Sequence, residues 1–359
     1  MKRTLALLLA LVMILALCAC GQKAAPAAPA EPKTETAAAP APAEAKPEEP
    51  AAPAFTPQTV KMALVVNEGT PVAECSKAFA EAVKEKTNGD ITIEVYAGGV
   101  LGAETELKEA VSLGTVQLVN LGWSLLSNKF SYSMSYIGYY ELPNRDAMNP
   151  FFAGPEAQRL YDAYESQTGV RVISTNWQQG NRHTIASRPF SNLDELKGLK
   201  IRTPAGVTLD LDAWTAWGAS PTGMALSEVY SAIEQGVIDA VECPLDYLWN
   251  YKFNEAGAKY LMLTGHQLYN NLVAVNTDWF DALPAEYQQI IIDCANEAGD
   301  EQTKQVIAQE DSYIQMFKDA GVTVVEISDD VKAQLKALVA PLNEEQRAKC
   351  DEEIKAYGF

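Results

Sequence analysis

Histidine and positive charge are the scarcest features of this 359-residue chain. It has two histidines, His183 and His266, and its 28 lysines and arginines are outnumbered by 47 aspartates and glutamates, which gives a net charge of −19. Neither histidine lies in a zinc-protease or nucleophile-elbow pattern, and no phosphate-binding GxxxxGK segment is present. Nucleic acid is excluded as an expected partner, because binding it needs a basic surface. The sequence therefore gives little support to an enzyme, and both histidines are most simply structural residues that form hydrogen bonds.

Motifs for cofactors and metals are also missing. The AGGVLG run at 97–102 follows a strand-like segment, but its glycine spacing differs from the dinucleotide fingerprint and is typical of a tight turn. The segment LDLDAW, with Asp210 and Asp212, lacks the turn glycine and the closing glutamate of a calcium loop. We therefore expect no cofactor and no metal ion.

The cysteines and apolar runs of the rest of the chain are equally sparse. Beyond the N-terminal segment, no stretch approaches the ~20 apolar residues of a spanning helix. Four cysteines remain there, and their wide spacing fits neither a zinc pattern nor a dense disulfide framework. We expect mostly free, buried thiols at these four positions: Cys75, Cys243, Cys294 and Cys350.

The N-terminus has the pattern of a secretory signal. Lys2 and Arg3 precede an apolar run over 5–17, which is too short for a stable membrane span. The following Leu-Cys-Ala-Cys-Gly resembles a bacterial lipoprotein signal, with a small residue directly before the second cysteine. We predict a signal peptide at 1–19 and a lipid-bearing Cys20, anchored on the extracytoplasmic face of a membrane, in a periplasm or on a Gram-positive cell surface. Cys18 fits less well because a bulky leucine precedes it, and ordinary secretion with an unmodified cysteine is the alternative.

Residues 20–57 are almost wholly alanine, proline, glutamate, lysine and threonine. Such a composition cannot bury enough apolar surface to offset its conformational entropy. We predict a disordered tether between the anchor and a folded domain.

From residue 58 onwards, strand-like and helix-like patterns alternate. Strands are predicted at 60–66, 91–99, 116–122 and 170–177, and helices between them at 72–89, 105–114 and 158–169. This alternation predicts the α/β class, with parallel sheets flanked by helices. The segment is long for one compact core, so we expect two α/β lobes.

A long helix is predicted late in the chain. Pro284 suits its first turn and Gly321 its end, and no proline intervenes. Unbroken, it would extend for ~50 Å at 1.5 Å per residue, long enough to bridge both lobes. Gly299 is the expected position of a bend.

Two arginines, Arg182 and Arg202, stand on either side of a strand-forming stretch in the segment GNRHTIASRPFSNLDELKGLKIRTP. A guanidinium group holds a carboxylate well, because its planar donors match two oxygens at once. In so acidic a protein, two nearby arginines indicate a local anion site. The alternative is that both are ordinary surface ion-pair partners.

Several segments resemble the solute-binding proteins of TRAP (tripartite ATP-independent periplasmic) transporters, the DctP-like family. They cover almost all of the chain beyond residue 57: IEVYAGGVLG with ELKEAVSLGTVQLV, the arginine segment above, MALSEVYSAIEQGVIDAVECPLDYLW, YLMLTGH and NTDWFDALPAEYQQII. The resemblance implies a two-lobe periplasmic-binding-protein-like fold with a hinge. We predict one lobe from 58–179 with 269–308 and the other from 180–268 with 309–359.

The resemblance also implies roles for individual residues. The arginine of the KGLKIR-type motif, here Arg202, would form the main salt bridge to a ligand carboxylate, and Arg182, twenty residues earlier, would assist. Where the family has Glu-Asn-Pro, this chain has Cys243 as the middle residue, and Leu226 stands where an aromatic residue often packs on the ligand. Both departures would make the pocket more apolar.

Three further residues are candidates for ligand contact. Trp123 follows a strand where the family's first lobe reaches the cleft, and Trp177 precedes the first arginine. A tryptophan in an α/β domain is more often a core residue. Asn67, after the first strand, is a weaker candidate for a polar contact.

The sequence thus predicts an extracytoplasmic lipoprotein that captures a small organic anion for a TRAP-type membrane permease. A binding protein for an ABC importer, a ligand-sensing receptor and, less favoured, a surface hydrolase are the alternatives.

Overall fold

The structure, a computed structural model, describes residues 55–359. The predicted signal peptide, Cys20 and nearly all of the predicted tether lie outside the described residues. Within 55–359, no helix combines the length and the apolar character needed to cross a bilayer, and no group of side chains could hold a metal ion. All four cysteines of this part are free and buried, which confirms the expectation.

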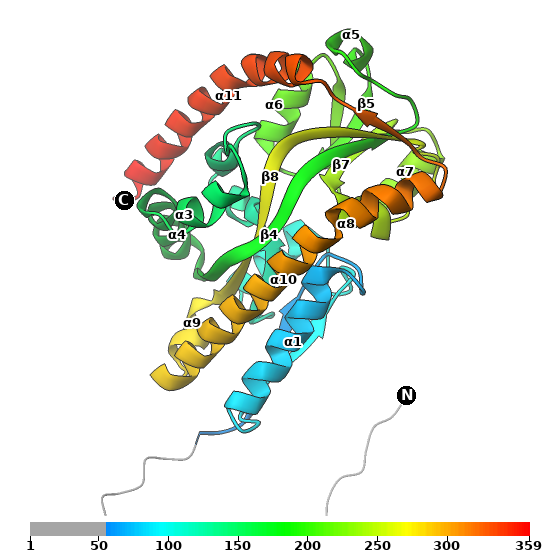
Figure 1. Ribbon diagram of the computed structural model, residues 1–359. Coiled ribbons are helices and arrows are strands. Elements are labelled where there is room, and N and C mark those ends of the chain that lie inside the picture. Colours follow the sequence, from blue (N-terminus) through cyan, green and yellow to red (C-terminus); the bar gives the residue numbers. More distant parts are fainter. Residues whose placement is uncertain (1–54) are drawn as a thin grey trace, which may run out of the picture. The chain divides into compact units, whose positions relative to one another are not determined.

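The described residues form one nine-stranded sheet with helices on its faces (Figure 1). The strand order is β2-β1-β3-β8-β4-β7-β5-β6, and β9 pairs with β8. The strands are β1 (Gln58–Ala63), β2 (Ile91–Tyr96), β3 (Leu118–Gly122), β4 (Val170–Ala186), β5 (Lys200–Pro204), β6 (Ser220–Met224), β7 (Ala240–Pro244), β8 (Tyr260–Asn276) and β9 (Thr323–Glu326).

Every strand and helix predicted up to residue 177 is present; most bounds differ by a few residues, but the strand predicted at 170–177 continues to Ala186. The helices are α1 (Pro71–Lys86), α2 (Glu104–Ser112), α3 (Met148–Phe152), α4 (Pro155–Thr168), α5 (Leu193–Leu196), α6 (Thr208–Ala216), α7 (Val229–Glu234), α8 (Leu245–Asn250), α9 (Thr277–Asp281), α10 (Ala285–Asp319) and α11 (Asp329–Ala356). Local hydrophobic periodicity predicted α1, α2, α4 and α10.

The prediction of parallel sheets is wrong for the middle of the sheet. At one end β1 pairs in parallel with β2 and β3, and at the other end β5 pairs in parallel with β6 and β7. Between these ends, β3, β8, β4 and β7 pair antiparallel. The two parallel ends form two lobes, and the long strands β4 and β8 run from one lobe into the other. Alternation of strands and helices along the chain cannot reveal strands that cross between lobes.

The middle of β4 and β8 has the features of a hinge. Gly180 of β4 and Gly265 of β8 have positive φ angles of 80° and 54°, a conformation that favours glycine. The register of the β4–β8 pair shifts between Gln178 and Gly180 and again between Arg182 and Thr184. The lobe boundaries predicted above fall within these two continuous strands, and they stay a prediction.

Helix α10 bridges the two lobes, as predicted. It follows Pro284, is unbroken over 35 residues, and packs on α1 at one end and on α8 and β9 at the other (Figure 1). Gly299 has a packing role, because an added Cβ would lie 2.3 Å from Asn176 Oδ1 and 2.8 Å from the Trp177 ring. Only glycine lets the helix approach β4 this closely.

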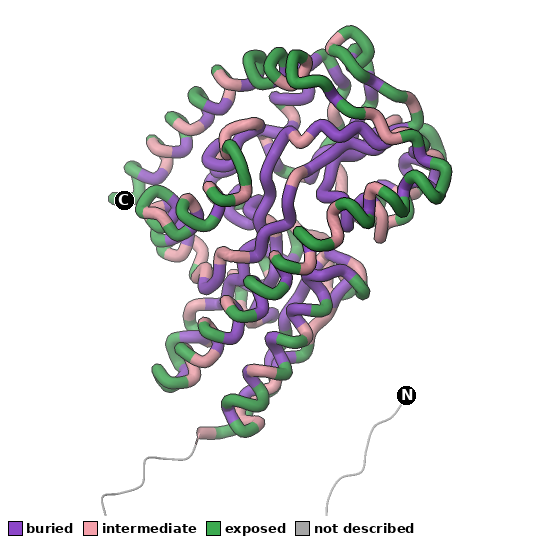
Figure 2. Tube along the Cα trace, viewed as in Figure 1, coloured by how far each residue is buried: buried purple, intermediate pink, exposed green. Residues whose placement is uncertain are grey.

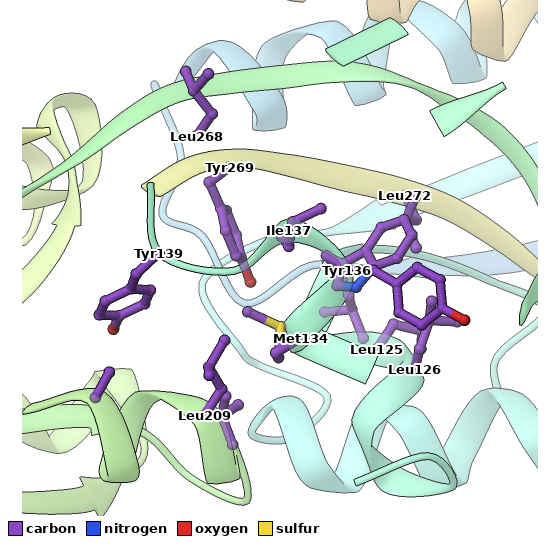
Figure 3. Packing of buried hydrophobic residues seen from close by; sticks show 14 of the residues in the cluster. Leu125, Leu126, Met134, Tyr136, Ile137, Tyr139, Leu209, Leu268, Tyr269 and Leu272 are labelled. Atoms are coloured by element: carbon purple, nitrogen blue, oxygen red, sulfur yellow. The ribbon is translucent and has the colours of Figure 1, made fainter. Parts of the chain in front are cut away.

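Burial follows the central strands, whereas the outer faces of α10 and α11 are exposed (Figure 2). One part of the core gathers side chains from η1 (Trp123–Asn128), η2 (Ser133–Ile137), α6 and β8. Figure 3 shows Tyr269 projecting from β8 towards this group, near Ile137 and Met134. This packing fixes the position of Tyr269 beneath the cleft described next.

Candidate functional site

A cleft of about 300 Å³ lies between the carboxyl ends of strands from both lobes. In sheets of this kind, the loops that follow the strands commonly bind ligands. The first lobe contributes residues that follow β1 and β2, and the second contributes residues of β5, β6 and the segments after them. The lining is Val65, Asn67, Gly98, Gly99, Gly102, Ala103, Glu104, Thr105, Arg202, Ala205, Met224, Ala225, Leu226, Ser227 and Tyr251.

A smaller hollow of about 40 Å³ shares four residues with the cleft and extends it inwards. Its remaining lining comes mainly from the strands that join the lobes and from α8. The lining is Val65, Glu104, Gly122, Arg182, Arg202, Pro204, Leu226, Cys243, Tyr247, Tyr269 and Asn271. The two predicted arginines therefore lie at one continuous site.

Arg202 is a buried arginine without a carboxylate partner in the described part of the chain. It lies on β5, between Thr222 of β6 and Val241 of β7, and its side chain is held by one hydrogen bond, from Nε to the Met224 carbonyl at 3.0 Å. Only 4% of the residue is exposed, and no acidic oxygen of residues 55–359 lies within 4.0 Å of its guanidinium. Since buried charges are normally paired, this arrangement suits an anion supplied from outside.

Arg182 is also buried, but its charge is already balanced. On the antiparallel pair β4–β7, Thr184 lies opposite Glu242, so Arg182 and Glu242 are diagonal neighbours on one face. Arg182 Nη2 donates to Glu242 Oε1 at 2.7 Å and to the Glu242 carbonyl at 3.0 Å, and its Nε donates to Oε2. The guanidinium also lies 4.5 Å from the ring centre of Tyr269.

Glu242 is held by a second partner, His266. His266 Nε2 lies 3.2 Å from Glu242 Oε2, and Thr264 Oγ1 lies 2.8 Å from the other ring nitrogen. Burial alone would raise the pKa of Glu242, but the charge of Arg182 and the hydrogen bonds from His266 and Arg182 hold that pKa below its usual value. The carboxylate stays ionised and fixes the orientation of Arg182.

The histidines have the structural roles expected from the sequence. Burial lowers the pKa of His266, and it lowers the pKa of His183 to about 3, so both rings are neutral at pH 7. His183 Nδ1 accepts a hydrogen bond from the Gly265 N–H at 3.1 Å. Both rings therefore connect β4, β7 and β8 through hydrogen bonds.

A second ion pair, of a buried lysine with a partly exposed glutamate, lies at the first-lobe side of the cleft, and the sequence did not single it out. Glu104 begins α2 and pairs with Lys108 one turn later, with 2.9 Å between Lys108 Nζ and Glu104 Oε1. Ser124 Oγ donates to the same oxygen at 2.6 Å and lies 3.0 Å from the Tyr269 hydroxyl. The sequence feature that could have indicated Glu104 is its position, in the first turn of the helix that follows the glycine turn at 97–102.

The structure places three of the other predicted residues at this site. Asn67 and Leu226 line the cleft, and Leu226 and Cys243 line its inner extension. Cys243 Sγ lies 4.0 Å from Arg182 Nη2, and burial raises the pKa of this thiol to about 11. The thiol is therefore neutral, and it adds little hydrogen-bonding capacity to this wall of the site.

The two predicted tryptophans lie outside the lining of the cleft. Trp123 is fully buried against Phe152 and Tyr161, and its Nε1 donates to the Ser133 carbonyl at 2.9 Å. Trp177 is fully buried beside Gly299, where its Nε1 donates to Ser174 Oγ. Both have the core role that the residue type favours, so we leave them out of the proposed site.

Tyrosines, rather than tryptophans, supply the aromatic surface. Tyr251 lines the cleft, and its hydroxyl donates to the Val65 carbonyl at 2.8 Å, which connects the second lobe to the first. Tyr247 and Tyr269 line the inner extension. This aromatic lining cannot be recognised from the sequence, because the three tyrosines come from α8, the turn after it and β8.

Comparison with known proteins agrees with this geometry. Residues 62–349 match the DctP family, described as bacterial extracellular solute-binding protein, family 7. The chain is 32% identical over 255 residues to the 2,3-diketo-L-gulonate-binding periplasmic protein YiaO of Escherichia coli, covering 70% of this chain and 75% of that protein. It is 28% identical over 295 residues to the C4-dicarboxylate-binding periplasmic protein DctP of Rhodobacter capsulatus, covering 80% and 86%.

Solved structures share the fold over nearly their full length. A TRAP periplasmic solute-binding protein from Pseudomonas putida F1 with bound D-glucuronate superposes with a TM-score of 0.76 and 26% identity, covering 84% of this chain and 96% of that one. Another from Roseobacter denitrificans with bound L-galactonate has a TM-score of 0.75 and 26% identity, covering 82% and 99%. The chain therefore belongs to the DctP family of bacterial extracellular solute-binding proteins and has the two-lobe periplasmic-binding-protein fold of the TRAP solute-binding proteins.

Proposed function

We propose that this protein captures a small organic acid between its two lobes and delivers it to a TRAP-type membrane permease. The observation that carries the proposal is Arg202, a buried guanidinium at the cleft that has no carboxylate partner among residues 55–359. A ligand carboxylate would supply the missing countercharge, with two oxygens matched to the planar donors. Arg182 is committed to Glu242, so it supports the site rather than providing a second free charge.

The polar lining of the cleft, and the sugar acids that three of the four relatives are named for or hold, point to a hydroxylated acid. Asn67, Glu104, Thr105 and Ser227 bring polar side chains to a cleft whose volume suits a small molecule. The relatives described above are named for, or hold, diketogulonate, glucuronate, galactonate and C4-dicarboxylates. We propose that this chain binds an acid of the same general class.

Capture would involve closure of the lobes about β4 and β8. Arg202 and Leu226 belong to one side of the cleft, and Asn67 and Glu104 belong to the other. A ligand that contacts both sides favours the closed state, because it binds that state more tightly than the open one. Gly180 and Gly265 give the connecting strands the local freedom for this motion.

The test is calorimetry with sugar acids and dicarboxylates on the wild type and on Arg202→Ala. Leaving a ligand carboxylate without its guanidinium costs about 2–5 kcal/mol, so affinity should fall by tens to thousands of fold. Arg188→Ala is a matched control, because Arg188 is only partly buried, does not line the cleft, and donates its hydrogen bonds to the backbone carbonyls of Glu195 and Lys197. Unchanged affinity of the Arg202 variant for the cognate acid would refute the proposal.

We also propose that the chain is anchored through a lipid on Cys20. The support is the signal-like sequence before it and the extracellular family. Cys20→Ala should move the protein from the membrane fraction to the soluble fraction, whereas Cys18→Ala should not.

Delivery to a TRAP-type permease predicts a particular gene neighbourhood. We expect two genes for membrane proteins beside the gene for this chain, and no ATPase gene.

A further inference from the structure

We propose that Glu104, held in place by Lys108, makes the site select hydroxylated monocarboxylates over dicarboxylates. This inference rests on the proposed function, since it assumes that a ligand carboxylate meets Arg202. It goes further, because it names the residue that contacts the end of the ligand away from Arg202, and the ligand group, a hydroxyl, that donates a hydrogen bond to this residue.

The two oxygens of Glu104 have different environments. Oε1 accepts from both Lys108 Nζ, at 2.9 Å, and Ser124 Oγ, at 2.6 Å. Oε2 has no hydrogen-bond partner among residues 55–359, and the side chain keeps 26% of its surface exposed. Because Glu104 lines both the cleft and its inner extension, this second oxygen is the acceptor available to a ligand.

Lys108 is a positioning residue, because its ammonium cannot reach a ligand. Its side chain is 2% exposed, and Nζ is shared between Glu104, the Ser124 carbonyl at 2.5 Å and Ser127 Oγ at 3.5 Å. These bonds fix both ends of the ion pair. The positive charge also offsets the charge of Glu104, so the pair attracts a cationic ligand less than a lone carboxylate would.

The two sides of the cleft therefore suit a ligand with two different ends, one anionic and one that donates a hydrogen bond. Arg202 offers an unpaired positive charge, and across the cleft Glu104 Oε2 offers a fixed acceptor without a donor. A ligand hydroxyl donates to this oxygen. A second carboxylate has no proton to donate, and in a cleft partly removed from water it is repelled by Glu104. An acid with one carboxylate and several hydroxyls satisfies both ends.

Matched acids test this directly. D-galactonate and D-galactarate differ in one terminal group, a CH₂OH in the first and a carboxylate in the second, and D-gluconate and D-glucarate form a second such pair. By calorimetry at pH 7.5, wild-type protein should bind the better aldonate at least 100-fold more tightly than its aldarate. Glu104→Gln should reduce that ratio at least tenfold, because the amide no longer repels a carboxylate and can donate to it.

Two further variants separate selectivity from general damage. Glu109→Gln, an exposed carboxylate on the same helix, should leave the ratio unchanged. Lys108→Met should raise affinity for 6-amino-6-deoxy-D-gluconate, which carries an ammonium group at the end away from its carboxylate, relative to D-gluconate at least tenfold, because Glu104 then lacks its countercharge. Thermal unfolding identifies any variant that fails to fold. If Lys108→Met fails, the ratio in Glu104→Gln tests the inference, and if Glu104→Gln fails, the ratio in the wild type does.

The outcomes distinguish the two proposals. Equal affinity of the wild type for aldonate and aldarate, or an unaltered ratio in Glu104→Gln, would overturn this inference and leave the proposed function standing. Failure of the wild type to bind any acid, with no effect of Arg202→Ala, would overturn the proposed function itself.

Discussion

Arg182 and Arg202 are twenty residues apart and line the same site, yet their surroundings differ in one decisive respect. Both are almost fully buried, but Arg182 is paired with Glu242, whereas Arg202 bonds only to a backbone carbonyl within the described part of the chain. A buried, paired arginine is part of the fold, and removing its partner leaves a charge that water cannot reach. A buried arginine that faces a cleft unpaired is available for a ligand. The difference shows that identical residue types at one site can divide into a structural and a binding role.

Two acidic residues show the same contrast between a paired and an unpaired buried group. Glu242 lies on β7 and Asp246 in the first turn of α8, four residues later, and both are buried. Burial raises the pKa of Asp246 to about 7, an effect partly offset by the backbone N–H groups of Tyr247 and Asp246, whereas Arg182 and His266 lower the pKa of Glu242 despite its burial. Asp246 Oδ2 has no hydrogen-bond partner in residues 55–359. The presence of a cation, rather than burial, decides the protonation state.

The largest effect on stability should come from breaking the paired arginine. Glu242→Ala leaves Arg182 buried without its partner, which should lower the free energy of unfolding by about 3–5 kcal/mol. Arg202→Ala should lower it by less than about 1 kcal/mol, because no buried acid loses its partner. Urea denaturation of both variants measures the difference. Equal losses would mean that the two arginines do not divide into structural and binding roles.

The unpaired carboxyl predicts a pH effect of intermediate size. Because the folded-state pKa of Asp246 lies above its unfolded value, this residue destabilises the fold as pH rises from about 4 to 7. Asp246→Asn should therefore be more stable than wild type at pH 8, by at most about 4 kcal/mol, with the gain vanishing near pH 4. Denaturation at several pH values tests the sign, and a gain that is constant from pH 4 to 8 would contradict the assignment.

The smallest effect concerns the wall of the site beside the paired arginine. Cys243 adds almost no hydrogen bonding there, and Cys243→Asn adds an amide next to Arg182. One new hydrogen bond contributes about 1 kcal/mol, so preference should shift roughly fivefold towards more hydroxylated acids. A competition panel with the same ranking as wild type would contradict this.

Some residues of the site could be predicted from the sequence and others could not. The arginines, Asn67, Leu226 and Cys243 were predicted for the site, and all lie at the cleft or its extension. Trp123 and Trp177 were predicted from their place after or before a motif, but adjacency in sequence does not fix which way a side chain points. Glu104 and the lining tyrosines were missed, because their proximity depends on packing between elements far apart in the chain.

The sequence by itself determined the α/β alternation, the long bridging helix and the membership of Arg202 in a family motif, because these depend on local periodicity and local residue order. The tertiary structure alone decided which buried charge is already balanced. Glu242 is sixty residues from Arg182 along the chain and next to it only through the pairing of β4 with β7. Electrostatic energy depends on distance in space, and that distance is set only when the sheet forms.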